Sequence, residues 1–307
     1  MNNKINRLLV PNVFPVSKII RGKIPFSLQP SALAQGRGNN VSLVGNHAVG
    51  TAAAQALLAS NGGHTAAFPI TPETEILHFI RQMEADGKIP SIGYNSHSEH
   101  EAMSAIIGSD FGQVRSFIAT ASVGFLHMYE MVAWAAQNRV RAVMALSNRE
   151  DAPLNIWNAD SDRIRARDFT IQLVAENHQQ AYDLTLQSFR IAEEIGWLTI
   201  INQAGFFISH SLDKLKILVD NEAINFVGPF RIDPAVDPFT QSVSKGGLAS
   251  PVALPLQRAQ NFEAWARVKN VVSSVHNEYG RISGRTPGAF FNSYYADADT
   301  KYLFLNY

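Results

Sequence analysis

Short apolar runs alternate with longer amphipathic or alanine-rich stretches along the chain from Val41 onward. The runs have the length of buried strands, and the stretches between them have the length of helices. The predicted strands span residues 64–68, 116–121, 142–146, 171–175 and 198–202, and the predicted helices span 45–60, 73–86, 98–109, 125–137 and 179–194. Such alternation is typical of βαβ units, so we expect a doubly wound α/β domain with a mostly parallel sheet.

The pattern changes after Gly205. Prolines and glycines are frequent over residues 228–256, which predicts an extended linker. A long helix over 257–279 and a last strand over 301–305 follow. We therefore expect an N-terminal extension at 1–40, an α/β domain at 41–227, and a long irregular C-terminal arm at 228–307.

Composition excludes several classes of function. Lys and Arg together number 26, as do Asp and Glu, so the chain has no basic footprint for nucleic acid or acidic lipid. No apolar run reaches the length of about 18 residues that a membrane-spanning helix needs. The chain contains no cysteine, which excludes disulfides, thiolate catalysis and cysteine-ligated iron–sulfur clusters on this polypeptide.

Four short motifs adjoin the predicted strands and helices. They are Phe-Pro-Ile-Thr-Pro at 68–72, Ser-Glu-His at 98–100, Thr-Ala-Ser-Val-Gly at 120–124, and Asn-Arg at 148–149. Three of them follow predicted strands, and the carboxyl ends of the strands are where open α/β sheets bind ligands. Taken singly, each also has a structural interpretation: first-turn acids favoured by the helix dipole, a turn threonine, and a surface arginine.

The order and spacing of these motifs resemble the α subunit of the 2-oxoacid:ferredoxin oxidoreductases, closest to the pyruvate type. Further segments resemble the same family: Gly-Asn-His-Ala-Val at 45–49, Asn-Ile-Trp with Ser-Asp at 155–162, and Gly-Phe-Phe-Ile-Ser-His at 205–210. Three positions depart from the family pattern. His47 stands where the family has an acid, Val123 where Gln is usual, and Ala204 where Asp is common.

The resemblance implies the pyrimidine-binding half of a thiamine diphosphate site. Glu99 would be the catalytic carboxyl, which drives the aminopyrimidine to its imino tautomer and must be buried to hold and pass a proton. Thr71 and Arg149 would bind the 2-oxoacid, the guanidinium holding its carboxylate in a bidentate manner. Ser122 and Gly124 would contact the cofactor together with Glu99, the glycine by allowing close backbone approach.

No metal site is expected on this chain. His97 and His100 lie beside Glu99, but their spacing is not that of a zinc helix. The Gly-Asp-Gly motif that binds magnesium and diphosphate in thiamine enzymes is absent, and in multi-subunit members of the family it lies on the β subunit. The resemblance therefore implies that Mg²⁺ and the [4Fe-4S] clusters are held by partner subunits.

The implied function is oxidative decarboxylation of pyruvate to acetyl-CoA and CO₂, with electrons passed to iron–sulfur clusters. The implied partners are a β-type subunit, γ-type and ferredoxin-like subunits, and ferredoxin, with pyruvate and CoA as substrates. One alternative is a non-catalytic paralogue that serves as a structural subunit of a larger complex. A more distant one is an enzyme for another 2-oxoacid, such as 2-oxoglutarate or oxalate, since Arg149 fits any 2-oxoacid.

Both ends of the chain carry expectations of their own. Residues 1–72 contain no Asp or Glu but six Lys or Arg, which fits a transit peptide as well as a solvated or partner-binding extension. We expect a cytoplasmic protein, or a mitochondrial or hydrogenosomal one if the extension is a transit peptide. The family α subunit continues into a second α/β domain, which we expect to be a separate polypeptide here, or lost.

Overall fold

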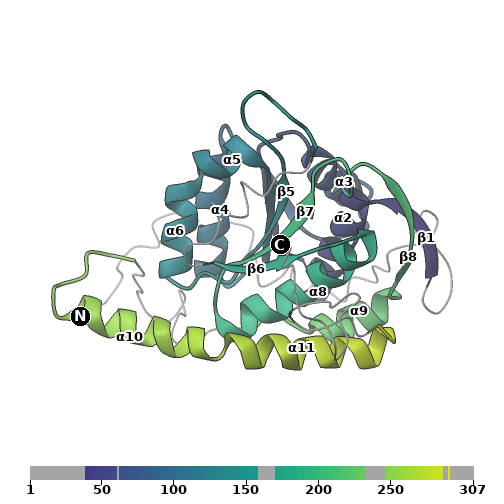
Figure 1. Cartoon of the computed structure of the whole chain (residues 1–307). Helices are drawn as coiled ribbons and strands as arrows, with labels where there is room; N and C mark the ends of the chain where they lie inside the picture. Colours follow the sequence, from purple (N-terminus) through teal and green to yellow (C-terminus); the bar gives the residue numbers. More distant parts are fainter. Residues whose placement is uncertain (1–38, 61, 158–169, 232–245, 286–289, 291–307) are drawn as a thin grey trace, which may run out of the picture.

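The computed structural model describes residues 39–60, 62–157, 170–231, 246–285 and 290 (Figure 1). Its centre is a sheet of six strands, in which every pairing is parallel. In spatial order the strands are β3 (Ile92–Asn95), β2 (His64–Ala67), β4 (Ser116–Thr120), β5 (Val143–Asn148), β7 (Thr199–Ala204) and β6 (Ile171–Val174). The predicted parallel α/β sheet is thereby confirmed.

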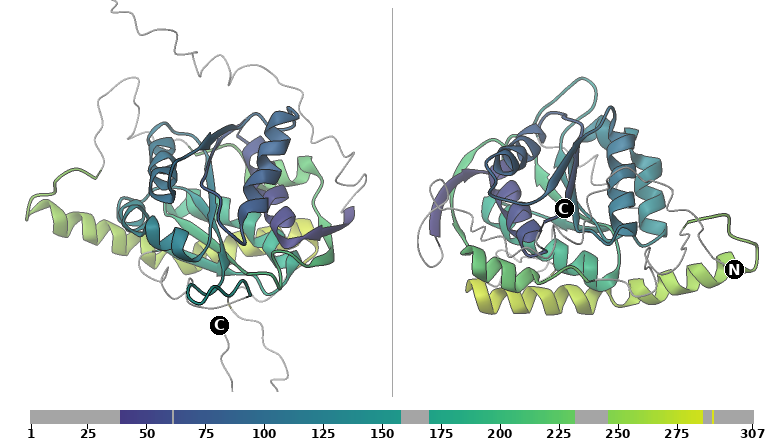
Figure 2. Two further views of the ribbon diagram at one scale, coloured as in Figure 1. Left: turned by 90° about the horizontal axis from the view of Figure 1, so that it is seen from above. Right: turned by 180° about the vertical axis from the view of Figure 1, so that it is seen from behind.

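Helices cover both faces of this sheet (Figures 1 and 2). On one side lie α4 (Glu99–Phe111) and α6 (Tyr129–Gln137), and on the other lie α2 (Gly45–Leu58) and α8 (His178–Ile195). All residues of the central strands β4 and β5 are buried, because side chains on both faces meet helices. This explains why the strands read as continuous apolar runs. The helix α3 (Thr74–Ala85) packs against α2.

Several elements differ from the predictions. The edge strand β3 is mostly exposed and therefore lacks the apolar run that would reveal it. A separate antiparallel pair, β1 (Asn39–Val44) and β8 (Leu212–Ile217), also has no strong apolar pattern. The single helix predicted over 125–137 is wrong, because Met128 divides this segment into α5 (Ser122–His127) and α6.

The described part of the C-terminal arm is more helical than expected. It follows α9 (Asp220–Val227) and consists of α10 (Ala253–Ala266) and α11 (Val268–Ser283), where one helix over 257–279 was predicted. The first turn of α10 also shortens the predicted linker. The predicted strand at 301–305 and the basic extension up to residue 38 lie outside the described residues, so both remain predictions, as do the domain boundaries.

The arm is attached to the domain through α8. Tyr279 on α11 donates its hydroxyl proton to Asp183 Oδ1 at 2.6 Å, and Arg285 contacts both carboxylate oxygens of Asp183 at 2.9 and 2.7 Å. Asp183 is buried, so these charge-assisted bonds satisfy an acid that would otherwise be costly to bury.

None of the described helices has the length and apolar character needed to cross a membrane.

Candidate functional site

The turn that follows β2 carries the predicted substrate-binding threonine. Thr71 is exposed, and its peptide bond to Pro72 is cis. The backbone carbonyls of these two residues accept hydrogen bonds from different elements: Thr71 from Arg149 Nε at 2.7 Å, and Pro72 from Asn46 Nδ2 at 2.8 Å. The turn is therefore fixed by its backbone, while the Thr71 side chain faces solvent.

Arg149 follows β5 and lies next to this turn. Its side chain is buried, and besides the Thr71 carbonyl it donates from Nη1 to the carbonyl of Glu150 at 2.6 Å. The strands β2 and β5 flank β4, so the predicted pair of Thr71 and Arg149 is brought together at the carboxyl edge of the sheet.

A network of buried amides lies behind the turn. Asn46, at the start of α2, accepts a hydrogen bond from Gln203 Nε2 at 2.7 Å, and Gln203 also donates to Ser147 Oγ at 2.9 Å. Asn46 and Gln203 are both completely or almost completely buried. Asn46 lies in the family-like segment 45–49 but was not singled out as a site residue. For Gln203 the only signal was an amide directly after a predicted strand.

Glu99 opens α4, together with a second acid, Glu101. The Ser98 hydroxyl accepts from Glu101 N–H at 3.1 Å, as an N-cap should. Glu101 accepts the Tyr94 hydroxyl proton and the His97 N–H, and the bond from Tyr94 lowers the pKa of Glu101. Glu101 is thus a capping acid, whereas Glu99 is only 6% exposed and takes no part in the cap.

The Glu99 carboxylate lies against α5. Its Oε2 is 2.8 Å from His127 Nδ1, and its Oε1 lies over Gly124. A Cβ at residue 124 would approach Thr120 Oγ1 to 2.6 Å and Glu99 Oε1 to 2.9 Å, both closer than atoms pack. Glycine is therefore required at this position for Glu99 to lie where it does. Of the predicted residues, Glu99 and Gly124 are in close proximity.

Ser122 begins α5 with a left-handed backbone conformation, φ 47°, which is uncommon for a residue with a side chain. The residue is buried, and its hydroxyl donates to Asp151 in the loop after β5. This bond connects the predicted cofactor-binding segment to the loop that follows Arg149. The Ser122 hydroxyl therefore hydrogen-bonds within the protein, to the Asp151 carboxylate.

Glu73 is a buried acid that sequence reasoning missed. It is fully buried after the Thr71 turn, where Oε1 accepts the Ile70 N–H at 3.1 Å and Oε2 has no hydrogen-bond partner in the part of the chain that the structure describes. Burial raises the pKa of Glu73 well above its usual value, and the charges of Glu75 and Glu99 act in the same direction, against the bond from Ile70. The Glu73 carboxyl therefore takes up a proton more readily than an ordinary glutamate does.

Large apolar side chains are exposed around these residues. Val123 and Leu126 lie on α5, Leu154 and Trp157 in the loop after β5, and Phe207 in the turn after β7. Each of the five has at least 43% of its surface exposed. A cluster of this kind at the edge of a polar site is typical of a surface that another protein covers.

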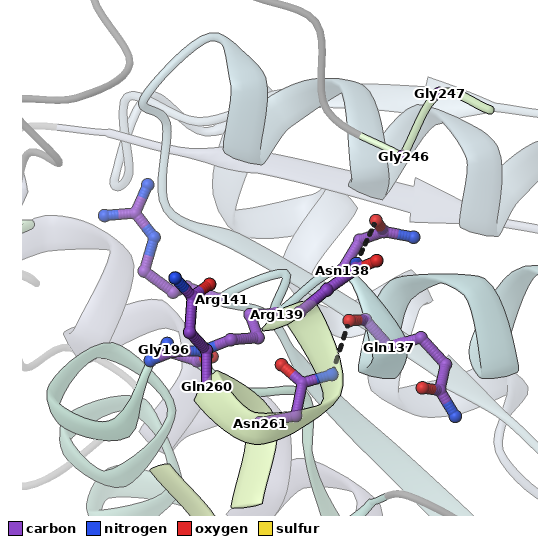
Figure 3. Close-up of a pocket in the computed structure, with 10 residues that line it drawn as sticks. Gln137, Asn138, Arg139, Arg141, Gly196, Gly246, Gly247, Gln260 and Asn261 are labelled. Atoms are coloured by element: carbon purple, nitrogen blue, oxygen red, sulfur yellow. Dashed lines mark hydrogen bonds between the residues drawn. The ribbon is translucent and has the colours of Figure 1, made fainter. Parts of the chain in front are cut away.

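A polar cavity of about 430 Å³ lies elsewhere in the molecule (Figure 3). It is lined by Arg139 and Arg141 before β5, by Gly196 before β7, and by Gln260 and Asn261 of α10. The two arginines and Gly196 precede their strands, so the cavity is at the opposite sheet edge from Glu99 and Thr71.

Within the described residues, no group of three or more His, Asp or Glu could hold a metal ion.

Comparison with known proteins shows the family. The profile of the pyruvate flavodoxin/ferredoxin oxidoreductase, thiamine diphosphate-binding family matches residues 56–277. The ketoisovalerate oxidoreductase subunit VorA of Pyrococcus horikoshii is 32% identical over 82% of this chain and 65% of its own length. The pyruvate synthase subunit PorA of Pyrococcus furiosus is 36% identical over 72% of this chain and 57% of its own length. The chain thus spans less than two thirds of these relatives.

A solved structure has the same fold. The 2-oxoglutarate:ferredoxin oxidoreductase from Magnetococcus marinus, solved with 2-oxoglutarate, coenzyme A and succinyl-CoA bound, superposes with a TM-score of 0.62. The match covers 76% of this chain and 46% of that one, at 15% sequence identity. At this identity the likeness establishes the shared fold alone.

Proposed function

The chain belongs to the pyruvate flavodoxin/ferredoxin oxidoreductase family, and from this premise we propose that it supplies the pyrimidine-binding half of a thiamine diphosphate site. The observation that carries the proposal is the Glu99 carboxylate. It is buried, it is not used to cap its helix, and one of its oxygens lies over a glycine that leaves no room for a side chain. A buried acid held in this way is suited to proton transfer with a ligand.

The surrounding residues fit an aminopyrimidine ring. Thr120 Oγ1 is buried next to Gly124 and Glu99, and it has no hydrogen-bond partner among the described residues. Buried polar atoms are rarely left unpaired, so this hydroxyl favours a polar ligand at the same place. The backbone of Gly124 permits close approach. Glu99, Thr120 and Gly124 would hold the ring, and Ser122 would fix the start of α5 through Asp151.

When bound, thiamine diphosphate supplies the chemistry for cleaving the bond between a keto carbon and its carboxylate. The part of this chain in that reaction is proton transfer and orientation. Glu99 Oε1 would hold a proton at a ring nitrogen and return it. The exposed Thr71 hydroxyl and the guanidinium of Arg149 would orient the 2-oxoacid at the same sheet edge.

We propose pyruvate as the substrate, with CoA accepting the acetyl group, so that the chain acts as an α-type subunit. Named relatives include a pyruvate synthase subunit and a ketoisovalerate oxidoreductase subunit, which supports a 2-oxoacid substrate. The chain has no cysteine for an iron–sulfur cluster. The [4Fe-4S] clusters and Mg²⁺ would be on partners: a β-type subunit, γ-type and ferredoxin-like subunits, and ferredoxin as the acceptor. The exposed apolar cluster beside Glu99 supports such a partner.

The test uses the native complex, purified through a tag on this chain. We expect pyruvate- and CoA-dependent reduction of a viologen dye, and we expect Glu99→Ala to lower the rate by at least about 100-fold, the usual contribution of acid–base catalysis. Glu101→Ala is the matched control, because Glu101 is an acid of the same helical turn that only caps it. It should assemble and retain most of the activity.

The second candidate function is a structural subunit, which the departures at His47, Val123 and Ala204 favour. A wild-type complex that contains a thiamine-binding partner but does not reduce the dye would support it. Equal rates for wild type and Glu99→Ala would exclude the catalytic role of Glu99.

A further inference from the structure

His127 ends α5, three residues after Gly124, and residues at this spacing lie on the same face of a helix. That face packs on Glu99: Gly124 lies under Oε1, and His127 Nδ1 is 2.8 Å from Oε2. One short helix therefore contacts both oxygens of the same carboxylate. His127 belongs to none of the motifs found in the sequence.

The direction of the bond depends on the protonation of the two groups. An ionised carboxylate can only accept, so in that form of Glu99 the bond runs from His127 Nδ1–H to Glu99 Oε2. Among the described residues, no other side chain hydrogen-bonds Glu99. Without His127, the carboxylate would be free to rotate about its terminal torsion, which is broad for glutamate.

We propose that His127 is a positioning residue for Glu99: it engages Oε2 and thereby leaves Oε1 directed at the ring nitrogen of the cofactor. The inference rests on the proposed function. It assigns the two oxygens of Glu99 to different tasks, one to the protein and one to the ligand.

A purely stabilising role would have a different consequence. The His127 side chain is 59% exposed, and a polar contact this accessible to solvent contributes little to folding stability. Orientation of a catalytic group is more sensitive, since a displacement of about 1 Å can cost about 100-fold in rate. Loss of His127 should therefore reduce turnover while the complex stays folded.

The experiment compares wild type, His127→Leu, His127→Ala and His127→Asn in the native complex. The asparagine amide places an N–H donor close to the position of Nδ1, whereas leucine and alanine have none. The readouts are kcat and KM for pyruvate, and the rate at which the thiazolium C2 proton of bound thiamine diphosphate exchanges with deuterium. The exchange rate reports cofactor activation without any substrate. His100→Leu is the control, because His100 lies 3.9 Å from the exposed Glu130 and not against Glu99.

We expect His127→Leu and His127→Ala to lower kcat and the exchange rate about tenfold or more, with KM for pyruvate unchanged. His127→Asn should recover at least about a third of both rates, and His100→Leu should equal wild type. A wild-type exchange rate in the leucine and alanine variants would overturn the inference, as would an asparagine variant no faster than leucine. If Glu99→Ala is inactive while His127→Leu is normal, only this inference fails; if Glu99→Ala is active, the proposed function fails.

Discussion

At the scale of single residues, the surroundings separate two acids that the electrostatics of a helix end does not distinguish. Glu99 and Glu101 both lie in the first turn of α4, where the helix dipole favours either. Glu101 faces the cap and is satisfied by Tyr94 and His97, whereas Glu99 faces α5 and is buried. The dipole explains the presence of both acids but not the burial of one.

The space at Gly124 gives the first prediction. In Gly124→Ala the new Cβ would displace Glu99 Oε1 or Thr120 Oγ1, so we expect dye reduction to fall at least about tenfold through misplacement of the carboxylate. Overpacking should also lower the free energy of unfolding by about 1–3 kcal/mol. Both are measured on the purified complex, by assay and by urea denaturation.

Gly108→Ala is the matched control for this variant. Gly108 lies in α4 with open space around it, so alanine there should stabilise the helix by about 0.5–1 kcal/mol and leave activity unchanged. Full activity in Gly124→Ala would show that the position of Glu99 is not restricted by residue 124.

Glu73 gives a prediction about pH. Its pKa in the folded chain is raised above 4.5, so the folded state binds more protons than the unfolded state above that pH. The contribution of Glu73 to stability therefore declines as the pH rises from 4.5 toward its folded pKa, by up to about 1.4 kcal/mol per pH unit.

The Glu73→Gln variant keeps the shape of the side chain but has no ionisable group. We expect its stability relative to wild type to be greater at pH 7.5 than at pH 4.5, measured by thermal denaturation of the full chain. Glu101→Gln should behave in the opposite way, because the pKa of Glu101 is lowered. If the stability difference between Glu73→Gln and wild type were the same at both pH values, Glu73 would be ionised in the folded chain at neutral pH.

At the scale of elements, the Thr71 turn depends on helix α2 and strand β7. Asn46→Ala removes the donor to the Pro72 carbonyl and the acceptor for Gln203, leaving buried polar groups unpaired. We expect a loss of about 1–3 kcal/mol in the free energy of unfolding. We also expect KM for pyruvate to rise at least about threefold, because the turn that presents Thr71 would shift.

Thr51→Ala is the control for Asn46→Ala. Thr51 is equally buried on α2, but its hydroxyl donates to the carbonyl of His47 within the same helix. Its KM should match wild type. A normal KM in Asn46→Ala, in a complex that remains assembled, would show that the network stabilises the fold without positioning the turn.

The elements that were predicted and those that were missed differ in burial. The strands β4, β5 and β7 are buried throughout or nearly so, and the apolar runs within them were visible in the sequence. The edge strand β3 and the outlying β8 are mostly exposed, so no apolar pattern marked them. The break at Met128 was hidden for the opposite reason, because apolar residues continue on both sides of it.

At the scale of the whole molecule, the described residues contain one part of the proposed site. Glu99, Thr71 and Arg149 lie at one sheet edge, beside an exposed apolar cluster. We expect the isolated chain to be inert toward pyruvate and to show no saturable binding of thiamine diphosphate below about 1 mM by calorimetry. Activity should appear when a β-type subunit is added. Turnover of pyruvate by the isolated chain would contradict the shared site.

The sequence by itself determined the class of fold, the buried strands and the family, because these depend on local apolar patterns and short motifs. It also identified Glu99, Thr71, Ser122, Gly124 and Arg149 as candidate site residues. Their roles in the proposed reaction remain predictions for the experiments above.

Tertiary structure alone decided what each candidate contacts. Glu99 meets His127 across 28 positions of sequence, Arg149 meets the Thr71 carbonyl across 78, and Gln203 meets Asn46 across 157. Local patterns carry no information on such pairs, because they form only when the parallel strands align their carboxyl ends. The burial of Glu73 and the assignment of the two Glu99 oxygens follow from the same alignment.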